Sequence, residues 1–136
     1  MVHPDITLAT ETIHNPDEPR HFMRVMPIPR EIEVRRGDTL IARSRRALRL
    51  TELGRDVYDP VVYIPPEDLQ IEMRRVEDKT TYCPLKGHAV YFQLDDAKTA
   101  LAWAYAETKD FASVLTGYVA FYPDQVAIAE IGSEAR

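Results

Sequence analysis

The residues best suited to chemistry lie in a short segment, 82–87, with the sequence Tyr-Cys-Pro-Leu-Lys-Gly. Cys83 is the only cysteine of the chain, and Lys86 follows it by three residues. The proline and the glycine predict a tight turn, which would bring the thiol and the ammonium group close together. A neighbouring ammonium group favours the thiolate, the nucleophilic form of cysteine. We therefore take Cys83 and Lys86 as candidate catalytic residues.

The same segment could bind a ligand. Lys86 could hold a phosphate or a carboxylate, and Gly87 would let the backbone approach a ligand closely. Each residue also has a purely structural interpretation. Cys83 can be a small buried apolar residue, since buried cysteine is usually inert, and Lys86 can be a solvated charge in the turn. Both interpretations stay open from the segment alone.

Aromatic residues outside this segment could line a small-molecule pocket: Tyr63, Tyr91, Trp103, Tyr105 and Tyr122. Rings that carry a hydroxyl or an indole N–H are common in such pockets, and we take all but Tyr122 as candidate ligand contacts. The same rings could instead fill the core of a small β domain. Glu52 is the best-placed acid for general acid–base work or ligand contact, although it could equally neutralise Arg46 or Arg49.

Positive charge is concentrated between residues 20 and 55, where ten arginines face four acidic residues, a local balance of +6. Arginine suits two-point capture of phosphate or carboxylate, and Arg43 lies in the densest part of this stretch. The alternative is a solvated strand surface on which the arginine stems cover apolar area. The whole chain has a net charge of -5, which argues against nucleic-acid binding.

Length and composition limit the remaining classes. A chain of 136 residues fits one domain, and a single cysteine excludes a disulfide framework or a multi-cysteine zinc site. His3, His14 and His21 are too widely spaced on a proline-rich arm to favour a three-histidine site. We therefore expect no metal and no cofactor. No apolar run approaches membrane-spanning length, so we expect a soluble, cytoplasmic protein with no membrane partner. A homodimer is compatible with the sequence.

The predicted elements place the candidate residues on strands behind an N-terminal arm. Residues 1–30 hold five prolines and predict an extended or irregular lead-in, so the domain should span 31–131. Within it, alternating or β-branched runs predict strands, and 66–69 resembles a single helical turn. A terminal hairpin should join 118–122 to 125–130. The other predicted strands are 31–35, 39–43, 47–51, 61–64, 69–74, 80–83 and 88–94.

One segment, 96–106, allows two predictions. It is rich in alanine, the best helix former. Yet Leu101, Trp103 and Tyr105 alternate with alanines, which is strand periodicity with small residues on one face. Taken alone, the segment leans to helix. If it is a strand, Trp103 and Tyr105 share a face and act together.

Five motifs, taken as a set, resemble one known family, the domain of unknown function 427. The most specific is Cys-Pro-x-Lys-Gly at 83–87, followed by Trp-x-Tyr at 103–105 and Gly-x-Val-Ala-Phe-Tyr at 117–122. The remaining matches begin at Gly37 and at Tyr63. The resemblance covers roughly residues 20–130. The matching segments are 37–44, 63–69, 81–91, 102–105 and 117–122.

The resemblance implies a mainly β fold: a small curved antiparallel sheet or barrel of the Mss4-like or β-tent type, with one or two short helices. It favours a strand over 100–106 and leaves a short helix within 108–115. Mss4-like proteins often hold zinc on paired Cys-x-x-Cys motifs, which this chain lacks. The family is sometimes labelled nucleotidyltransferase-like. The sequence, however, has no glycine-rich phosphate loop, and its one adjacent aspartate pair, Asp95 and Asp96, falls in a predicted turn.

Two classes of function follow. The first is a pocket for a small anionic ligand, built from the thiol, the lysine and the aromatic residues, with or without catalysis. The second is a protein-interaction module that presents a sheet edge or an aromatic patch to a partner. The mixture of thiol, amine and aromatic groups fits a pocket better than a flat interface.

Overall fold

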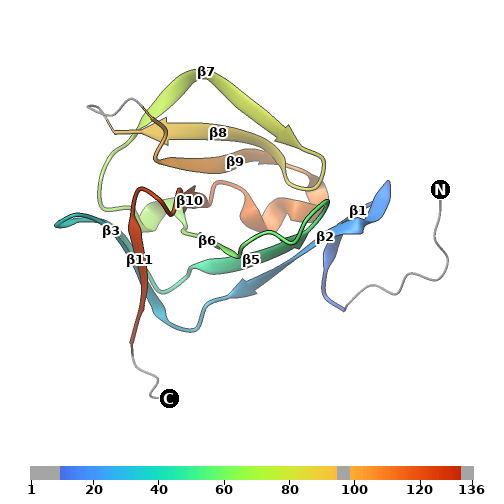
Figure 1. Ribbon diagram of the computed structural model, residues 1–136, viewed down its shortest axis with the longest axis horizontal. Coiled ribbons are helices and arrows are strands. Elements are labelled where there is room, and N and C mark those ends of the chain that lie inside the picture. The colour runs from blue at the N-terminus through green and yellow to red at the C-terminus, as the bar shows by residue number, and fades with distance from the viewer. Residues whose placement is uncertain (1–9, 95–98, 133–136) are drawn as a thin grey trace.

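A computed structural model describes residues 10–94 and 99–132 of the chain (Figure 1). Its strands form three antiparallel sheets, and none of the three closes on itself. The prediction of a single, mainly β domain is therefore confirmed. Asp95 and Asp96 lie outside the described residues. Among the described residues, no helix is long and apolar enough to cross a membrane.

The first sheet has the strand order β1-β2-β5-β6. Its strands are β1 (Ile13–Asn15), β2 (Glu18–Pro27), β5 (Leu48–Leu53) and β6 (Val61–Tyr63). The prediction of a lead-in arm before residue 31 is wrong for 18–27, because β2 pairs with β5 from Phe22 to Pro27 and buries Met23 completely. Its prolines, Pro19 and Pro27, lie near the two ends of the strand, where a missing N–H is tolerated.

The second sheet has the order β10-β9-β8-β7. It contains β7 (Arg74–Cys83), β8 (Gly87–Gln93), β9 (Ala102–Thr108) and β10 (Val119–Phe121). The strand prediction for 100–106 is confirmed from Ala102 onward. Tertiary packing overrides helix propensity here, because Ala102 and Ala104 of β9 are buried on one face while Trp103 and Tyr105 project from the other.

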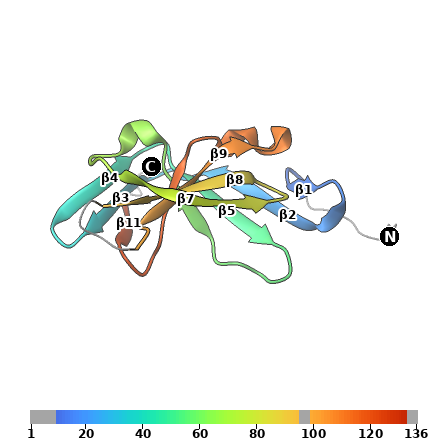
Figure 2. The same ribbon diagram turned by 90° about the horizontal axis from the view of Figure 1, so that it is seen from above.

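The third sheet has the order β11-β3-β4, with β3 (Glu31–Arg36), β4 (Thr39–Ser44) and β11 (Ala127–Ile131). The predicted hairpin of β3 and β4 is confirmed. The predicted terminal hairpin is wrong. β10 pairs with β9, whereas β11 crosses to β3, so the turn at Pro123 connects two different sheets. Figure 2 shows the third sheet at the opposite end of the molecule from β1.

Two short 3-10 helices complete the described structure: η1 (Pro66–Asp68) and η2 (Asp110–Leu115). Both lie where the sequence predicts helical residues. The predicted strand at 69–74 is wrong, because only Leu69 forms a bridge, to Ala42, before β7 begins. Its alternation reflects burial on one side, since Leu69, Ile71 and Met73 pack against a buried cluster.

A backbone bridge joins the first two sheets along one edge. Ile64 follows β6 directly and exchanges two hydrogen bonds of 2.8 Å with Val119 of β10. The sheets then diverge, with β7, β8 and β9 above and β2 and β5 below in the view of Figure 1. The space between them holds one buried cluster, which includes Met23, Leu50 and Tyr63. The far face of β9 packs on the third sheet.

Candidate small-molecule site

A cavity of about 270 Å³ opens between the first two sheets. Three of its lining residues, Tyr58, Lys86 and Tyr122, lie outside the strands. Six of the residues that the sequence marked as candidates line it together: Glu52, Tyr63, Lys86, Tyr91, Trp103 and Tyr105. The site is therefore a small aromatic chamber with one ammonium group and one carboxylate, and we call it the aromatic cavity.

Strand register explains the lower wall of the aromatic cavity. Leu50 and Glu52 are two residues apart on β5, so their side chains share one face. Val61 of β6 is paired directly with Leu50, and Tyr63 lies two residues further along the same strand. Four side chains from two neighbouring strands thus face the same space.

The upper wall comes from β8 and β9. Tyr91 is paired directly with Trp103, and Tyr105 lies two residues beyond Trp103, so the three rings occupy one face of the second sheet. The prediction that Trp103 and Tyr105 share a face is confirmed. On the opposite face, Ala102 and Ala104 are buried against the third sheet. The small residues let β9 sit between the two packed layers.

The rings make specific contacts with one another. Trp103 donates an indole hydrogen bond of 3.3 Å to the Tyr63 hydroxyl, and the two rings meet edge to face at 6.5 Å between centroids. Tyr122 lies 4.8 Å from Trp103 by the same measure. The Tyr91 hydroxyl hydrogen bonds to Thr81 at 2.7 Å. These contacts fix the orientations of the rings.

Burial makes the hydroxyls of two cavity tyrosines hard to ionise. Loss of solvation raises the pKa of Tyr63 well above its usual range, although its hydrogen bond with Trp103 opposes this, and the negative charge of Glu52 adds to it. Burial also raises the pKa of Tyr105, with a further contribution from Tyr63. The cavity therefore keeps both phenols as neutral hydrogen-bond donors.

The alkaline stability of the protein should depend on Tyr105. The unfolded chain ionises tyrosine near pH 10, whereas folded Tyr105 keeps its proton. Its contribution to stability is complete below pH 10 and falls by about 1.4 kcal/mol for each further pH unit. We expect Tyr105→Phe to lose stability less steeply than the wild type above pH 10. Urea unfolding at neutral and alkaline pH tests this, and identical pH profiles would contradict it.

Lys86 reaches across from the turn between β7 and β8 to the first sheet. Its side chain is 9% exposed, and its ammonium group forms an ion pair with Glu52 Oε1. The other carboxylate oxygen, Oε2, lies 2.9 Å from His21 Nε2. Glu52 thus pairs with Lys86 and His21, and not with Arg46 or Arg49 as the sequence allowed. One carboxylate connects both sheets through its two oxygens.

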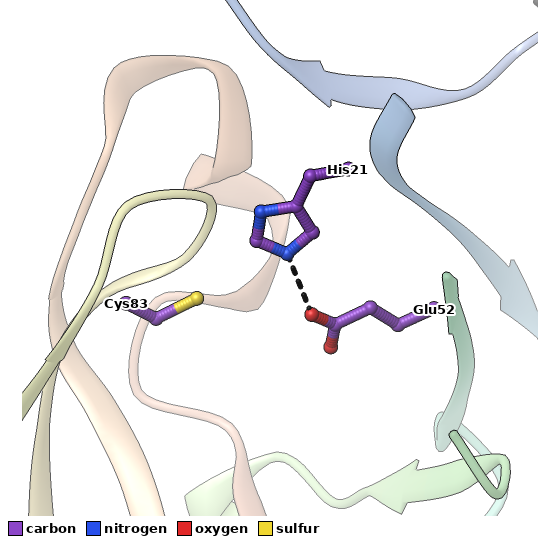
Figure 3. Close-up of side chains that lie close together, drawn as sticks. All are labelled: His21, Glu52 and Cys83. Carbon is purple, nitrogen blue, oxygen red and sulfur yellow. Dashed lines mark hydrogen bonds and ion pairs between the residues drawn. The ribbon is translucent and has the colours of Figure 1, made fainter. Parts of the chain in front are cut away.

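Cys83 lies beside this pair, at the end of β7, and is partly buried. A ring nitrogen of His21, a Glu52 oxygen and the Cys83 sulfur all lie within 4.8 Å of one another. Figure 3 shows the sulfur pointing toward the gap between the imidazole and the carboxylate. The structure therefore places the thiol next to Glu52, although Cys83 does not itself line the aromatic cavity.

Gly87 has a backbone role and is not among the lining residues of the aromatic cavity. It has φ +122°, and a Cβ atom there would lie 2.2 Å from the carbonyl oxygen of Glu107. The sequence suggested that Gly87 lets the backbone approach a ligand. Instead of a ligand, strand β9 approaches Gly87 closely, and its residue Thr108 is paired with Gly87.

Arg43 lies away from the aromatic cavity, on β4. Its guanidinium forms ion pairs with Glu31 at 3.0 Å and with Glu33 at 2.7 Å. Its neighbours in the arginine-rich stretch are paired as well: Arg45 with Glu31, Arg46 with Asp68 and Arg49 with Glu130. The stretch is a surface ion-pair network, which corresponds to the solvated-strand alternative, and it places Arg43 outside the site.

Sequence reasoning missed His21 as a site residue because it assigned the residue to an irregular arm. The local signal was short, since Met23, Arg24 and Val25 alternate as expected for a strand but His21 and Phe22 break the pattern. Met23 is paired directly with Glu52, and His21, two residues away on the same face, is therefore its diagonal neighbour. Tyr58, in the loop before β6, carried no such signal.

Comparison with known protein families gives a match. A family model described as "Domain of unknown function (DUF427)" matches residues 24–132, well over half of the chain. No curated protein matches the chain. The matched range contains every lining residue of the aromatic cavity and excludes His21.

Proposed function

Because the chain belongs to the domain of unknown function 427 family, whose description names no activity, we propose a function from the site itself. The domain binds a small anionic molecule in the aromatic cavity, with the negative group of the ligand at Lys86. The observation that carries this proposal is the position of Lys86, an almost buried ammonium group that faces a chamber of aromatic rings. Lysine is rarely buried unless it has a partner.

The size of the cavity limits the ligand. Ligand pockets commonly measure about 300–1,000 Å³, and this one measures about 270 Å³. It therefore suits a molecule of roughly one ring or a short chain. The walls present ring faces for an apolar body, while the Tyr63 and Tyr105 hydroxyls offer hydrogen bonds. Such a ligand would combine a planar or apolar part with one charged end.

The charges leave room for an anion. Two groups that can carry positive charge, Lys86 and His21, share the single carboxylate of Glu52. A ligand carboxylate or phosphate can take one hydrogen bond from Lys86 while Glu52 keeps its contact with His21. Charge-assisted hydrogen bonds of this kind are stronger than hydrogen bonds between neutral groups. The ligand therefore need not leave Glu52 unpaired.

Trp103 gives a direct test, because it is the only tryptophan of the chain and lines the cavity. Benzoate and its neutral analogue benzamide are titrated into chelator-treated protein while Trp103 fluorescence is followed. We expect benzoate to change the fluorescence saturably and to bind at least about tenfold more tightly than benzamide, a difference of about 1.4 kcal/mol from the charged contact. Lys86→Met should remove this preference.

The matched control is Lys109→Met. Lys109 lies over the ring of the exposed Tyr82 at 5.1 Å and does not line the cavity, so its variant should bind like the wild type. Equal binding of benzoate and benzamide would contradict an anion site. Binding that survives Lys86→Met unchanged would place the anion elsewhere.

Three finer statements belong to the same proposal. The domain acts in the cytoplasm, its fold is of the β-tent type, and neither Cys83 nor Lys86 has to react covalently for the binding function. The absence of a membrane-spanning helix among the described residues supports the first. The antiparallel sheets with only short 3-10 helices support the second.

A further inference from the structure

We propose that His21, Glu52 and Cys83 form a site for a divalent transition metal, with Zn²⁺ as the chemically best match. This inference goes beyond the binding function and does not depend on it. A site of this kind needs no paired cysteines. It joins one nitrogen, one oxygen and one sulfur donor from three different strands.

The donor set suits zinc. Zn²⁺ binds cysteine sulfur, histidine nitrogen and carboxylate oxygen, and catalytic zinc sites commonly have three protein ligands and one open position. A thiolate also disfavours Mg²⁺ and Ca²⁺, which prefer oxygen ligands. The three side chains supply one donor of each type that zinc accepts. The fourth position would be open to water or to a ligand atom.

The spacing is close to that of a bound ion. Donors about 2.2 Å from one tetrahedral ion lie about 3.6 Å apart, and these three lie within 4.8 Å of one another. Figure 3 shows all three donor groups directed at a common region. The ion would replace the present hydrogen bond between His21 and Glu52, and small side-chain rotations would close the remaining difference.

Lys86 orients Glu52 without itself contacting the ion. It binds Glu52 Oε1 and so leaves Oε2 on the side of His21. Carboxylates that bind metals are typically held by further hydrogen bonds of this kind, which fix their orientation. A thiolate, a carboxylate and a neutral imidazole together balance the two charges of the ion, so the positive charge of Lys86 stays available to an anionic ligand.

The three side chains are sheltered but can be reached. The side chains of His21 and Glu52 are 18% and 12% exposed. Glu52 lines the aromatic cavity, while His21 and Pro84, the residue after Cys83, line a neighbouring cavity of about 590 Å³. Tyr58 borders both cavities. An ion could therefore enter from the second cavity and present its open position to either one.

The test uses Co²⁺ as a spectroscopic substitute for Zn²⁺ on the full, untagged chain after treatment with a chelator, without benzoate. We expect one Co²⁺ per chain and a sulfur-to-cobalt charge-transfer band. Because Cys83 is the only cysteine, that band can come only from its thiolate. Zn²⁺ should displace the cobalt and abolish the band. Cys83→Ser should lose the band, and His21→Asn and Glu52→Gln should each weaken cobalt binding at least about tenfold.

His88→Asn is the matched control, since His88 has a half-exposed side chain and lies near Glu107 and not near the trio. It should bind cobalt as the wild type does. The proposal is overturned if the wild type binds no cobalt, if it binds cobalt without the sulfur band, or if His21→Asn binds unchanged. The titration of the wild type does not depend on whether any variant folds. Its failure would leave benzoate binding untouched, so the two proposals fail separately.

Discussion

Gly87→Ala should strongly destabilise the domain. The new Cβ atom would lie 2.2 Å from the Glu107 carbonyl oxygen and 2.7 Å from Thr108 Cα. Both are backbone atoms of the paired strand β9, which cannot move aside as a flexible side chain can. A φ of +122° adds a conformation that alanine rarely adopts. We expect a loss of about 4 kcal/mol or more, a large part of the 5–15 kcal/mol typical of a domain. Urea unfolding followed by Trp103 fluorescence measures it.

Gly37→Ala is the control for this prediction. Gly37 also has a positive φ, +59°, but a Cβ atom there would meet nothing within 4 Å. Gly37→Ala should therefore lower the free energy of unfolding by only about 1 kcal/mol, the usual penalty for the left-handed conformation. If the two variants lose similar stability, the close approach of β9 to Gly87 is not what the position requires.

Glu52→Gln should be the most damaging of the charge-neutralising substitutions at the site. It would leave the almost buried ammonium group of Lys86 without its counter-charge, and such losses cost about 3–5 kcal/mol in a protein interior. We expect about 2–4 kcal/mol here, because both side chains keep slight exposure. Equilibrium urea unfolding at neutral pH gives the value.

A double-mutant cycle separates the ion pair from general damage. Adding Lys86→Met to Glu52→Gln should recover part of the lost stability, because no unpaired charge then stays buried. Glu107→Gln is the exposed counterpart, with a side chain 84% exposed, and should change stability by about 0.5 kcal/mol or less. A double variant that is no more stable than Glu52→Gln alone would show that the pair contributes little.

Much of the cavity could be predicted from the sequence, because alternation along a strand shows which side chains share a face. Trp103 and Tyr105, two residues apart, had to share a face once 102–108 was a strand. The residues of the Lys-Gly turn had to lie where β7 meets β8. Arginine density, in contrast, does not distinguish a ligand site from a surface network. The acidic partners of Arg43, Arg46 and Arg49 lie on β3, on η1 and on β11, so the pairing depends on the folded arrangement.

The parts of the fold and of the site that could not be predicted depend on pairing between strands that are distant in the sequence. The partner of β11 is β3 and not its neighbour β10, which no local pattern indicates, because register and partner choice depend on the assembled sheets. For the same reason, His21 could not be predicted as a site residue. Proline content suggested a loose arm, yet β2 becomes an inner strand between β1 and β5. Only that position brings an imidazole from the start of the chain to Glu52.

The bridge between Ile64 and Val119 has a mechanical consequence. It joins the first two sheets by reciprocal backbone hydrogen bonds at that edge. On the Lys86 side, a side-chain contact, the ion pair of Lys86 with Glu52, also joins the two sheets. Side-chain contacts rearrange faster and at lower cost than a paired backbone. We therefore expect the two sheets to stay joined at Ile64 and Val119. The aromatic cavity should widen from the Lys86 side, when the ion pair with Glu52 breaks.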